Sequence, residues 1–186
     1  MGVLGKQKKF VCIAIAFFFL GFLSGAAAYA QLEGMIPKMM EGVYRGIISE
    51  TSKPATALNI IKRNATATLA LILTGVTVVT PFLIVYFNGF FMGLGIRYVL
   101  AMGLPLSTIA KGVIPHGVFE LFAFFWAAGL GIELGFAVVN AALKKNFGGV
   151  KQNIKESLKT YVRFILPLVA IAGIIETYVS ATLLGV

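Results

Sequence analysis

Aspartate is absent from this chain of 186 residues, and histidine, cysteine and tryptophan each occur once. Charged residues make up 12% of the sequence, about half of their usual share in soluble proteins. The single cysteine excludes an internal disulfide. The sequence also lacks a Gly-x-Ser-x-Gly motif, a phosphate-binding glycine loop and a pair of histidines. The choice of residues for catalysis of the kind found in soluble enzymes is therefore small, which favours a non-enzymatic protein over an enzyme.

Apolar residues, in contrast, supply 59% of the chain, and the mean hydropathy is +0.92. Soluble domains have about 45–50% apolar residues, and a soluble fold would need more polar surface to cover its core. In lipid, a helix satisfies its own backbone hydrogen bonds, and about 20 apolar residues are enough to cross the bilayer. The sequence therefore predicts an all-α, polytopic transmembrane helical bundle that forms a single membrane domain over residues 1–186.

About five spans are expected from the apolar runs, which cover residues 10–30, 65–87, 90–104, 115–143 and 162–184. Asn88-Gly89 separates the second run from the third. The third run contains Arg97 and is short for a full span, so we expect it to tilt, break or re-enter. The first run ends in Ala28-Tyr29-Ala30, which resembles a signal-peptide cleavage site, but its length favours a retained helix.

The net charge of +9 comes from 16 lysines and arginines against 7 acids. Basic residues gather before the first run and in the loop at 144–161. This distribution is typical of cytoplasmic loops and not of a nucleic-acid-binding face. We therefore expect a multi-pass protein of the cell membrane with a cytoplasmic N-terminus, a cytoplasmic loop at 144–161 and an external segment at 31–63.

Ionisable residues inside the predicted spans are Arg97, His116, Glu120, Glu133 and Glu176. Each costs several kcal/mol at membrane depth and therefore needs a partner or a function. His116 and Glu120 are four residues apart and share a helix face. They fit a structural hydrogen bond, a pair that handles protons or ions, or two ligands of a metal ion. A metal would need a further ligand from Glu133, Glu176 or another chain.

Small residues recur at four-residue intervals in several of the predicted spans. Such stripes let helix backbones approach closely, so we expect helix packing to be their role. The residues concerned are Gly21, Gly25, Gly89, Gly93, Ala123, Ala127, Gly131 and Gly135.

Two motifs, Asn88-Gly89-Phe90-Phe91-Met92-Gly93 and Pro115-His116-Gly117-Val118-Phe119-Glu120, together resemble the stage II sporulation protein M family. The resemblance covers roughly residues 55–186, and Glu176 matches a late acid of that family. It implies a polytopic helical membrane protein; the sporulation member resembles a membrane anchor for cell-wall-degrading partners. It also implies an intramembrane polar centre made of Asn64, Asn88, Gly89, His116, Gly117 and Glu120.

Three functional hypotheses follow. The first is a membrane scaffold or permease-like module for partner proteins. The second is a transporter or channel that moves a proton, an ion or a small solute through His116, Glu120 and Glu176. The third is an intramembrane metal-dependent enzyme. The expected partners are the lipid bilayer, further copies of the chain and other membrane or cell-envelope proteins, but no nucleic acid. No cofactor is expected, with a metal ion on His116 and Glu120 as the alternative.

Overall fold

The computed structural model describes residues 3–39, 52–180 and 182, and within these ranges the chain is almost entirely helical and contains no strand. This confirms the predicted all-α class. The longer helices are α1 (Val3–Ala27), α4 (Lys53–Leu73), α5 (Thr80–Ala101), α6 (Leu106–Lys144), α7 (Gly148–Thr160) and α8 (Leu166–Ile175). Shorter elements are α2 (Tyr29–Leu32), η1 (Glu33–Met35), η2 (Thr74–Thr77), η3 (Tyr161–Ile165) and η4 (Glu176–Ser180).

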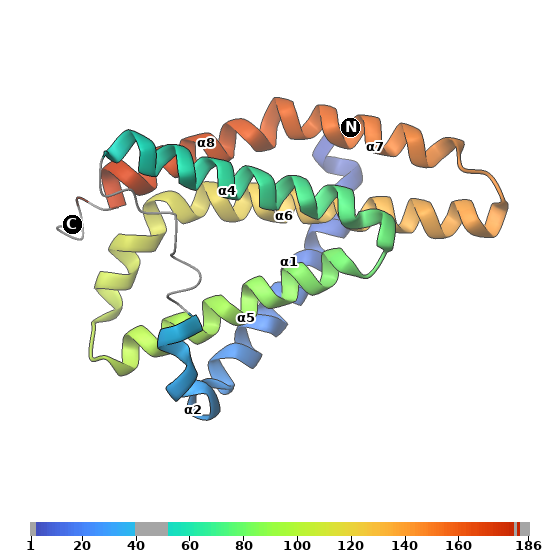
Figure 1. Cartoon of the computed structure of the whole chain (residues 1–186). Helices are drawn as coiled ribbons and strands as arrows, with labels where there is room; N and C mark the ends of the chain where they lie inside the picture. The colour runs from blue at the N-terminus through green and yellow to red at the C-terminus, as the bar shows by residue number, and fades with distance from the viewer. Residues whose placement is uncertain (1–2, 40–51, 181, 183–186) are drawn as a thin grey trace.

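The helices form two groups that meet along α6 (Figure 1). Helices α4, α6 and α8 run side by side, whereas α1 and α5 pack on each other and lean away from them. Four helical stretches are long and apolar enough to cross a membrane: Gln7–Ala27, Thr80–Ala101, Ile109–Lys144 and Gly148–Ser180. The chain is thus built as a multi-pass membrane protein. Helix α4 has 21 residues but carries Lys53, Lys62 and Arg63.

The chain breaks between α4 and α5 at a place that differs from the predicted one. Helix α5 continues through Asn88-Gly89, so the boundary expected there is wrong. Asn88 stays helical because its side-chain nitrogen donates to the Ile84 carbonyl at 2.8 Å. The break lies instead inside the predicted 65–87 span, between Leu73 and Thr80, where β-branched residues of low helix propensity are crowded.

This break is a γ-turn centred on Val78. The backbone of Val78 has φ 67° and ψ −50°, and the Val79 N–H donates to the Thr77 carbonyl at 2.8 Å. That form of the γ-turn is strained even for small residues, and positive φ is rare for a β-branched one. Pro81 in the first turn of α5 then starts the next helix.

Four glycines bring α1 and α5 into backbone contact. A Cβ atom on Gly21 or Gly25 would collide with the carbonyl oxygen of Tyr86 or Phe90 on α5. The relation is reciprocal, because a Cβ atom on Gly89 would collide with the Phe18 carbonyl oxygen, and Gly93 is equally close to α1. Close approach of this kind is what small residues permit between helices in lipid.

Helix α6 carries a second close contact. A Cβ atom on Gly131 would collide with the Leu71 carbonyl oxygen at the end of α4. One turn later, Gly135 faces the α4–α5 turn, with the Gly75 oxygen 3.2 Å from its Cβ position. Ala123 and Ala127, earlier in the same stripe, are fully buried in the core. Helix α6 therefore forms the centre of the bundle.

Further predicted boundaries change in the same way. Pro115 was expected at a helix start, but α6 begins at Leu106 and includes Pro115 in its interior. Figure 1 shows the first part of α6 turned away from the rest, as expected where proline cannot donate a backbone hydrogen bond. The predicted loop at 144–161 is mostly helix α7. Of the predicted external segment 31–63, residues 40–51 lie outside the described residues, and Lys53 onward belongs to α4.

Candidate intramembrane polar site

Three ionisable side chains from two different spans converge at one end of the α4–α6–α8 group. His116 and Glu120 project from α6, just beyond Pro115, and Glu176 projects from the end of the helix that follows α7. One donor atom from each of the three side chains lies within 4.8 Å of the donor atoms of the other two. All three side chains are half-buried. The two helices thus complete a site that neither forms alone.

His116 is oriented by a hydrogen bond across the helices. Its Nδ1 atom lies 3.0 Å from the Ser180 hydroxyl oxygen, although the two residues are 64 positions apart. Its Nε2 atom points to Glu120, with 3.9 Å between Nε2 and Oε2. That distance is too long for a hydrogen bond. The imidazole is therefore held on one nitrogen, while the other nitrogen faces the carboxyl groups across a gap.

Helix α4 supplies the third wall of the site. The Asn64 side-chain amide is near the Glu120 carboxyl group and acts on it from α4. The positive charge of Arg63 acts on both Glu120 and Glu176. The two carboxyl groups also act on each other. The site thus combines two acids with one cation, one imidazole and two uncharged polar groups, Asn64 and Ser180.

The segment that carries Glu176 and Ser180 is a π-helix, η4, which spans Glu176–Ser180. The wider turn of a π-helix is rare and occurs frequently at functional sites. It places Glu176 and Ser180, one turn apart, toward α6. Thr177, between them, is satisfied locally because its hydroxyl donates to the Gly173 carbonyl at 2.9 Å.

The site lies toward one end of α6, whereas the start of α1 and the α6–α7 turn lie toward the other end. Glu120 and Phe136 are about 24 Å apart along the helix at the usual rise. The Phe136 ring contacts the Phe10 ring of α1 at 5.5 Å, next to Lys8 and Lys9. Lys144 lies still farther along α6. The start of α1 and the α6–α7 turn are therefore on the side away from the site.

The polar centre implied by the family resemblance is divided in the structure. His116, Glu120 and Asn64 come together, whereas Asn88 is exposed on α5 and, among the described residues, bonds within its own helix. Gly89 lies in the α1–α5 contact described above. Gly117 is buried beside His116, and its Cβ position is 3.3 Å from the Val113 side chain.

The other predicted ionisable residues lie elsewhere. The Arg97 guanidinium is 5.8 Å from the centre of the Tyr29 ring of α2, whose hydroxyl in turn donates to Glu33 at 3.0 Å. Within the described part of the chain, the Arg97 guanidinium thus faces an aromatic ring. Glu133 is half-buried on α6, 13 positions and about 20 Å beyond Glu120.

Sequence reasoning missed Arg63 and Ser180. Arg63 lies just before the predicted span at 65–87, where a charged residue is ordinary, so the sequence did not mark it as a site residue. Ser180 lies four residues after Glu176, and that helical spacing was a usable signal for a shared face.

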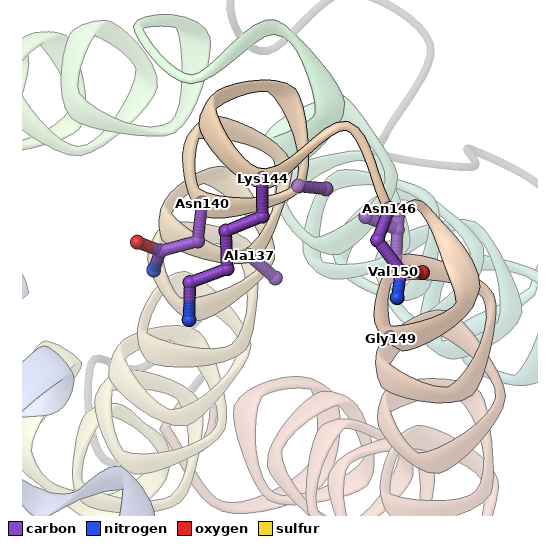
Figure 2. Close-up of a pocket in the computed structure, with 7 residues that line it drawn as sticks. Ala137, Asn140, Lys144, Asn146, Gly149 and Val150 are labelled. Atoms are coloured by element: carbon purple, nitrogen blue, oxygen red, sulfur yellow. The ribbon is translucent and has the colours of Figure 1, made fainter.

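A hollow lies at the other end of α6 from the polar site, where α6 turns into α7 (Figure 2). It has a volume of about 320 Å³ and is widely open. Asn140 and Lys144 line it from α6, and Asn146 and Val150 from the turn and the start of α7. It contains none of the three clustered ionisable groups, and the polar site remains the better candidate for chemistry.

Comparison with known proteins finds similarity over most of the chain. A relative from Methanocaldococcus jannaschii, described as an uncharacterized protein, is 27% identical over 173 residues, which cover 91% of this chain and 93% of the relative. No solved structure matches the chain. The family described as stage II sporulation protein M matches residues 14–181, which include both spans of the polar site. The chain therefore belongs to the stage II sporulation protein M family.

Proposed function

We propose that this chain is a permease-like membrane protein that moves a cation, with His116, Glu120 and Glu176 as its binding site. One observation carries the proposal: three ionisable groups from two spans converge within 4.8 Å in a bundle that crosses the membrane. Ionisable residues at membrane depth are costly, and they mark ion and proton pathways in many membrane proteins.

The charges of the site suit reversible binding of a cation. Two neighbouring carboxylates repel each other, and a bound cation would relieve that repulsion. Arg63 supplies a positive charge from α4 that acts on both acids. The Arg63 guanidinium would interact with the two carboxylates when the cation leaves, and this competition would help the site to release the cation.

The proposal includes an orientation. The basic start of α1 and the basic α6–α7 turn are both far from the polar site along α6. Cytoplasmic loops carry an excess of lysine and arginine. We infer that the N-terminus and the α6–α7 turn are cytoplasmic, and that the polar site lies toward the outer face of the membrane.

Flux measurements on proteoliposomes test this function. The purified chain is reconstituted with an internal pH-sensitive dye or a metal-sensitive dye, and a cation gradient is applied. We expect flux from the parent chain and from Glu156→Gln, a control on the exposed face of α7, but none from Glu120→Gln or Glu176→Gln. Equal flux in all four proteins, or none above that of empty vesicles, would overturn the proposal.

A second candidate function, a scaffold for partner proteins, is favoured by the α1–α5 pair. Their backbones are in contact at four glycines, and large apolar side chains on the outer faces of the pair are exposed. Leu20 and Leu23 of α1 and Leu83 and Phe87 of α5 are among them. Lipid, another copy of the chain or an envelope protein would cover these faces.

Cross-linking tests this second candidate. With Cys12 replaced by serine, Leu23→Cys on the outer face of α1 should form a disulfide-linked dimer in membranes if copies associate there. Ile171→Cys, on the exposed side of α8, is the control. Equal cross-linking at both positions would contradict a specific contact through α1.

A further inference from the structure

We infer that His116, Glu120 and Glu176 together bind one divalent transition-metal ion of the Zn²⁺ class. The inference names the cation for the proposed transport site and rests on that function for its biological meaning. Its structural basis, however, is independent of transport, because it follows from the donor atoms and their spacing.

The donor set selects the class of ion. One imidazole nitrogen and two carboxylate oxygens are the mixed ligands that Zn²⁺ and neighbouring transition metals accept. Ca²⁺ and Mg²⁺ prefer oxygen ligands alone, and Ca²⁺ needs six to eight of them. The ionisable side chains that converge at this site offer one nitrogen donor and two carboxyl groups. A nitrogen-containing set of three favours the transition metal.

The spacing is close to that of a tetrahedral site. Ligands at about 2.0–2.1 Å from Zn²⁺ lie about 3.4 Å from each other. The His116 Nε2 and Glu120 Oε2 atoms are 3.9 Å apart, and none of the three donor separations exceeds 4.8 Å. Small rotations of the two flexible glutamate side chains would close the gap. The separation also exceeds a hydrogen bond, so the pair does not satisfy itself in the way that a structural pair would.

Ser180 orients the His116 imidazole through a hydrogen bond, as residues that contact the ligands do at metal sites. Metal-binding histidines usually donate their second ring N–H to a nearby oxygen, which fixes the tautomer and the ring. The Ser180 hydroxyl, 3.0 Å from Nδ1, is placed to accept this hydrogen bond. With the proton on Nδ1, the lone pair of Nε2 faces Glu120.

The charge of the two carboxyl groups also favours a divalent ion. A divalent ion neutralises two carboxylates, which lowers the cost of keeping them away from water. Arg63 acts on the same two carboxyl groups and therefore competes with the ion. Three protein ligands leave a fourth position open, as in sites that exchange ligands and unlike closed structural sites with four.

Metal binding to the purified full-length chain tests the inference. The protein, freed of any affinity tag and stripped with a chelator, is dialysed against buffered Zn²⁺, and bound metal is measured by elemental analysis. We expect one high-affinity Zn²⁺ per parent chain. Glu120→Gln, Glu176→Gln and His116→Gln should each weaken binding by roughly 100-fold or more, and Ser180→Ala by about 10–100-fold. Arg63→Gln should strengthen it.

Glu156→Gln is the matched control, because Glu156 is exposed on α7 and its interaction with Lys159 is far from the site. It should bind as the parent does. Co²⁺ provides a second readout, since its visible absorption should indicate tetrahedral coordination in the parent chain and be lost in Glu176→Gln. Thermal unfolding of each apo variant shows whether the fold is intact.

The outcomes separate the inference from the transport function. Zn²⁺ binding that needs all three residues, without flux in vesicles, would support the site and overturn transport. Proton flux that needs Glu120 and Glu176, without Zn²⁺ binding, would support transport and overturn the metal site. Zn²⁺ bound equally by the parent and by all three ligand variants would overturn the inference, because the metal would then be held elsewhere.

Discussion

The indole N–H of Trp126 donates a 2.8 Å hydrogen bond to the side-chain oxygen of Gln7, and both side chains are buried. This bond joins the start of α1 to the middle of α6 across 119 positions of sequence. The Trp126 ring also stacks on Phe164, with ring centres 5.4 Å apart. The polar tip of the tryptophan is thus satisfied inside the bundle while its ring packs against apolar neighbours.

Gln7→Ala should destabilise the protein by about 1–3 kcal/mol, because the indole N–H would stay buried without an acceptor. Denaturant unfolding in detergent measures the effect, and the fluorescence of Trp126, the single tryptophan, reports it directly. Gln31→Ala, at an exposed position of α2, is the control and should change stability little. Equal stability of the parent and Gln7→Ala would contradict the role assigned to this bond.

Gly89→Ala should force α1 and α5 apart, because the added Cβ atom would overlap the Phe18 carbonyl oxygen. Backbone cannot yield as a flexible side chain can, so we expect a loss of more than about 2 kcal/mol, in the upper range for overpacking. Thermal unfolding in detergent provides the measurement.

Gly149→Ala is the matched control for this substitution, since nothing lies within 4 Å of its Cβ position on α7. It should be neutral or slightly stabilising, because alanine favours a helix over glycine. If the two variants were equally stable, the close α1–α5 contact would be wrong.

Val78→Gly should stabilise the protein, because glycine adopts the positive φ of the γ-turn without strain. Such strain costs of order 1–3 kcal/mol, so relieving it stabilises the folded state. The greater conformational freedom of glycine in the unfolded chain offsets part of this gain. We expect a net gain of about 1 kcal/mol, seen as a higher Tm.

Val76→Gly, two residues earlier, removes the same side chain from an exposed position with ordinary φ. It should destabilise by up to about 1 kcal/mol. A Tm that falls in both variants would show that the turn at Val78 carries no relievable strain.

Topology is tested with single cysteines in a Cys12→Ser background. Lys38→Cys should react with a membrane-impermeant reagent added outside cells, whereas Gln152→Cys on α7 should react only after the membrane is opened. The reason is the excess of lysine at the start of α1 and around α7. External labelling at position 152 would reverse the orientation.

The fold class followed from the sequence because composition alone excludes a soluble domain. The glycine stripes were visible as spacing, and the structure places Gly21, Gly25 and Gly93 in one helix crossing. The α4–α5 turn could not be found, because Asn-Gly is a stronger turn signal than a run of β-branched residues. In this chain, α5 stays helical across Asn88-Gly89 because Gly89 packs against α1.

The site was predictable in part. His116 and Glu120 share a helix face, which spacing alone reveals. Glu176 was singled out by its cost in lipid, but only the packing of α8 on α6 brings it to the pair. Asn88 was misplaced because the resemblance groups residues by motif, whereas the helix rotation that exposes Asn88 depends on the glycines facing α1.

The glycine contact between α1 and α5 has a consequence for synthesis. Gly25 emerges from the ribosome 64 residues before Gly89, an interval of about 3–13 s at 5–20 residues per second. During that time the small-residue stripe of the first helix has no α5 to pack against. The hydrogen-bond partner of Gln7, Trp126, is synthesised later still. A helix with such a stripe readily pairs with another of its kind. The order in which the spans enter the membrane thus leaves α1 open to early, wrong partners, and correct assembly depends on α5 arriving before they do.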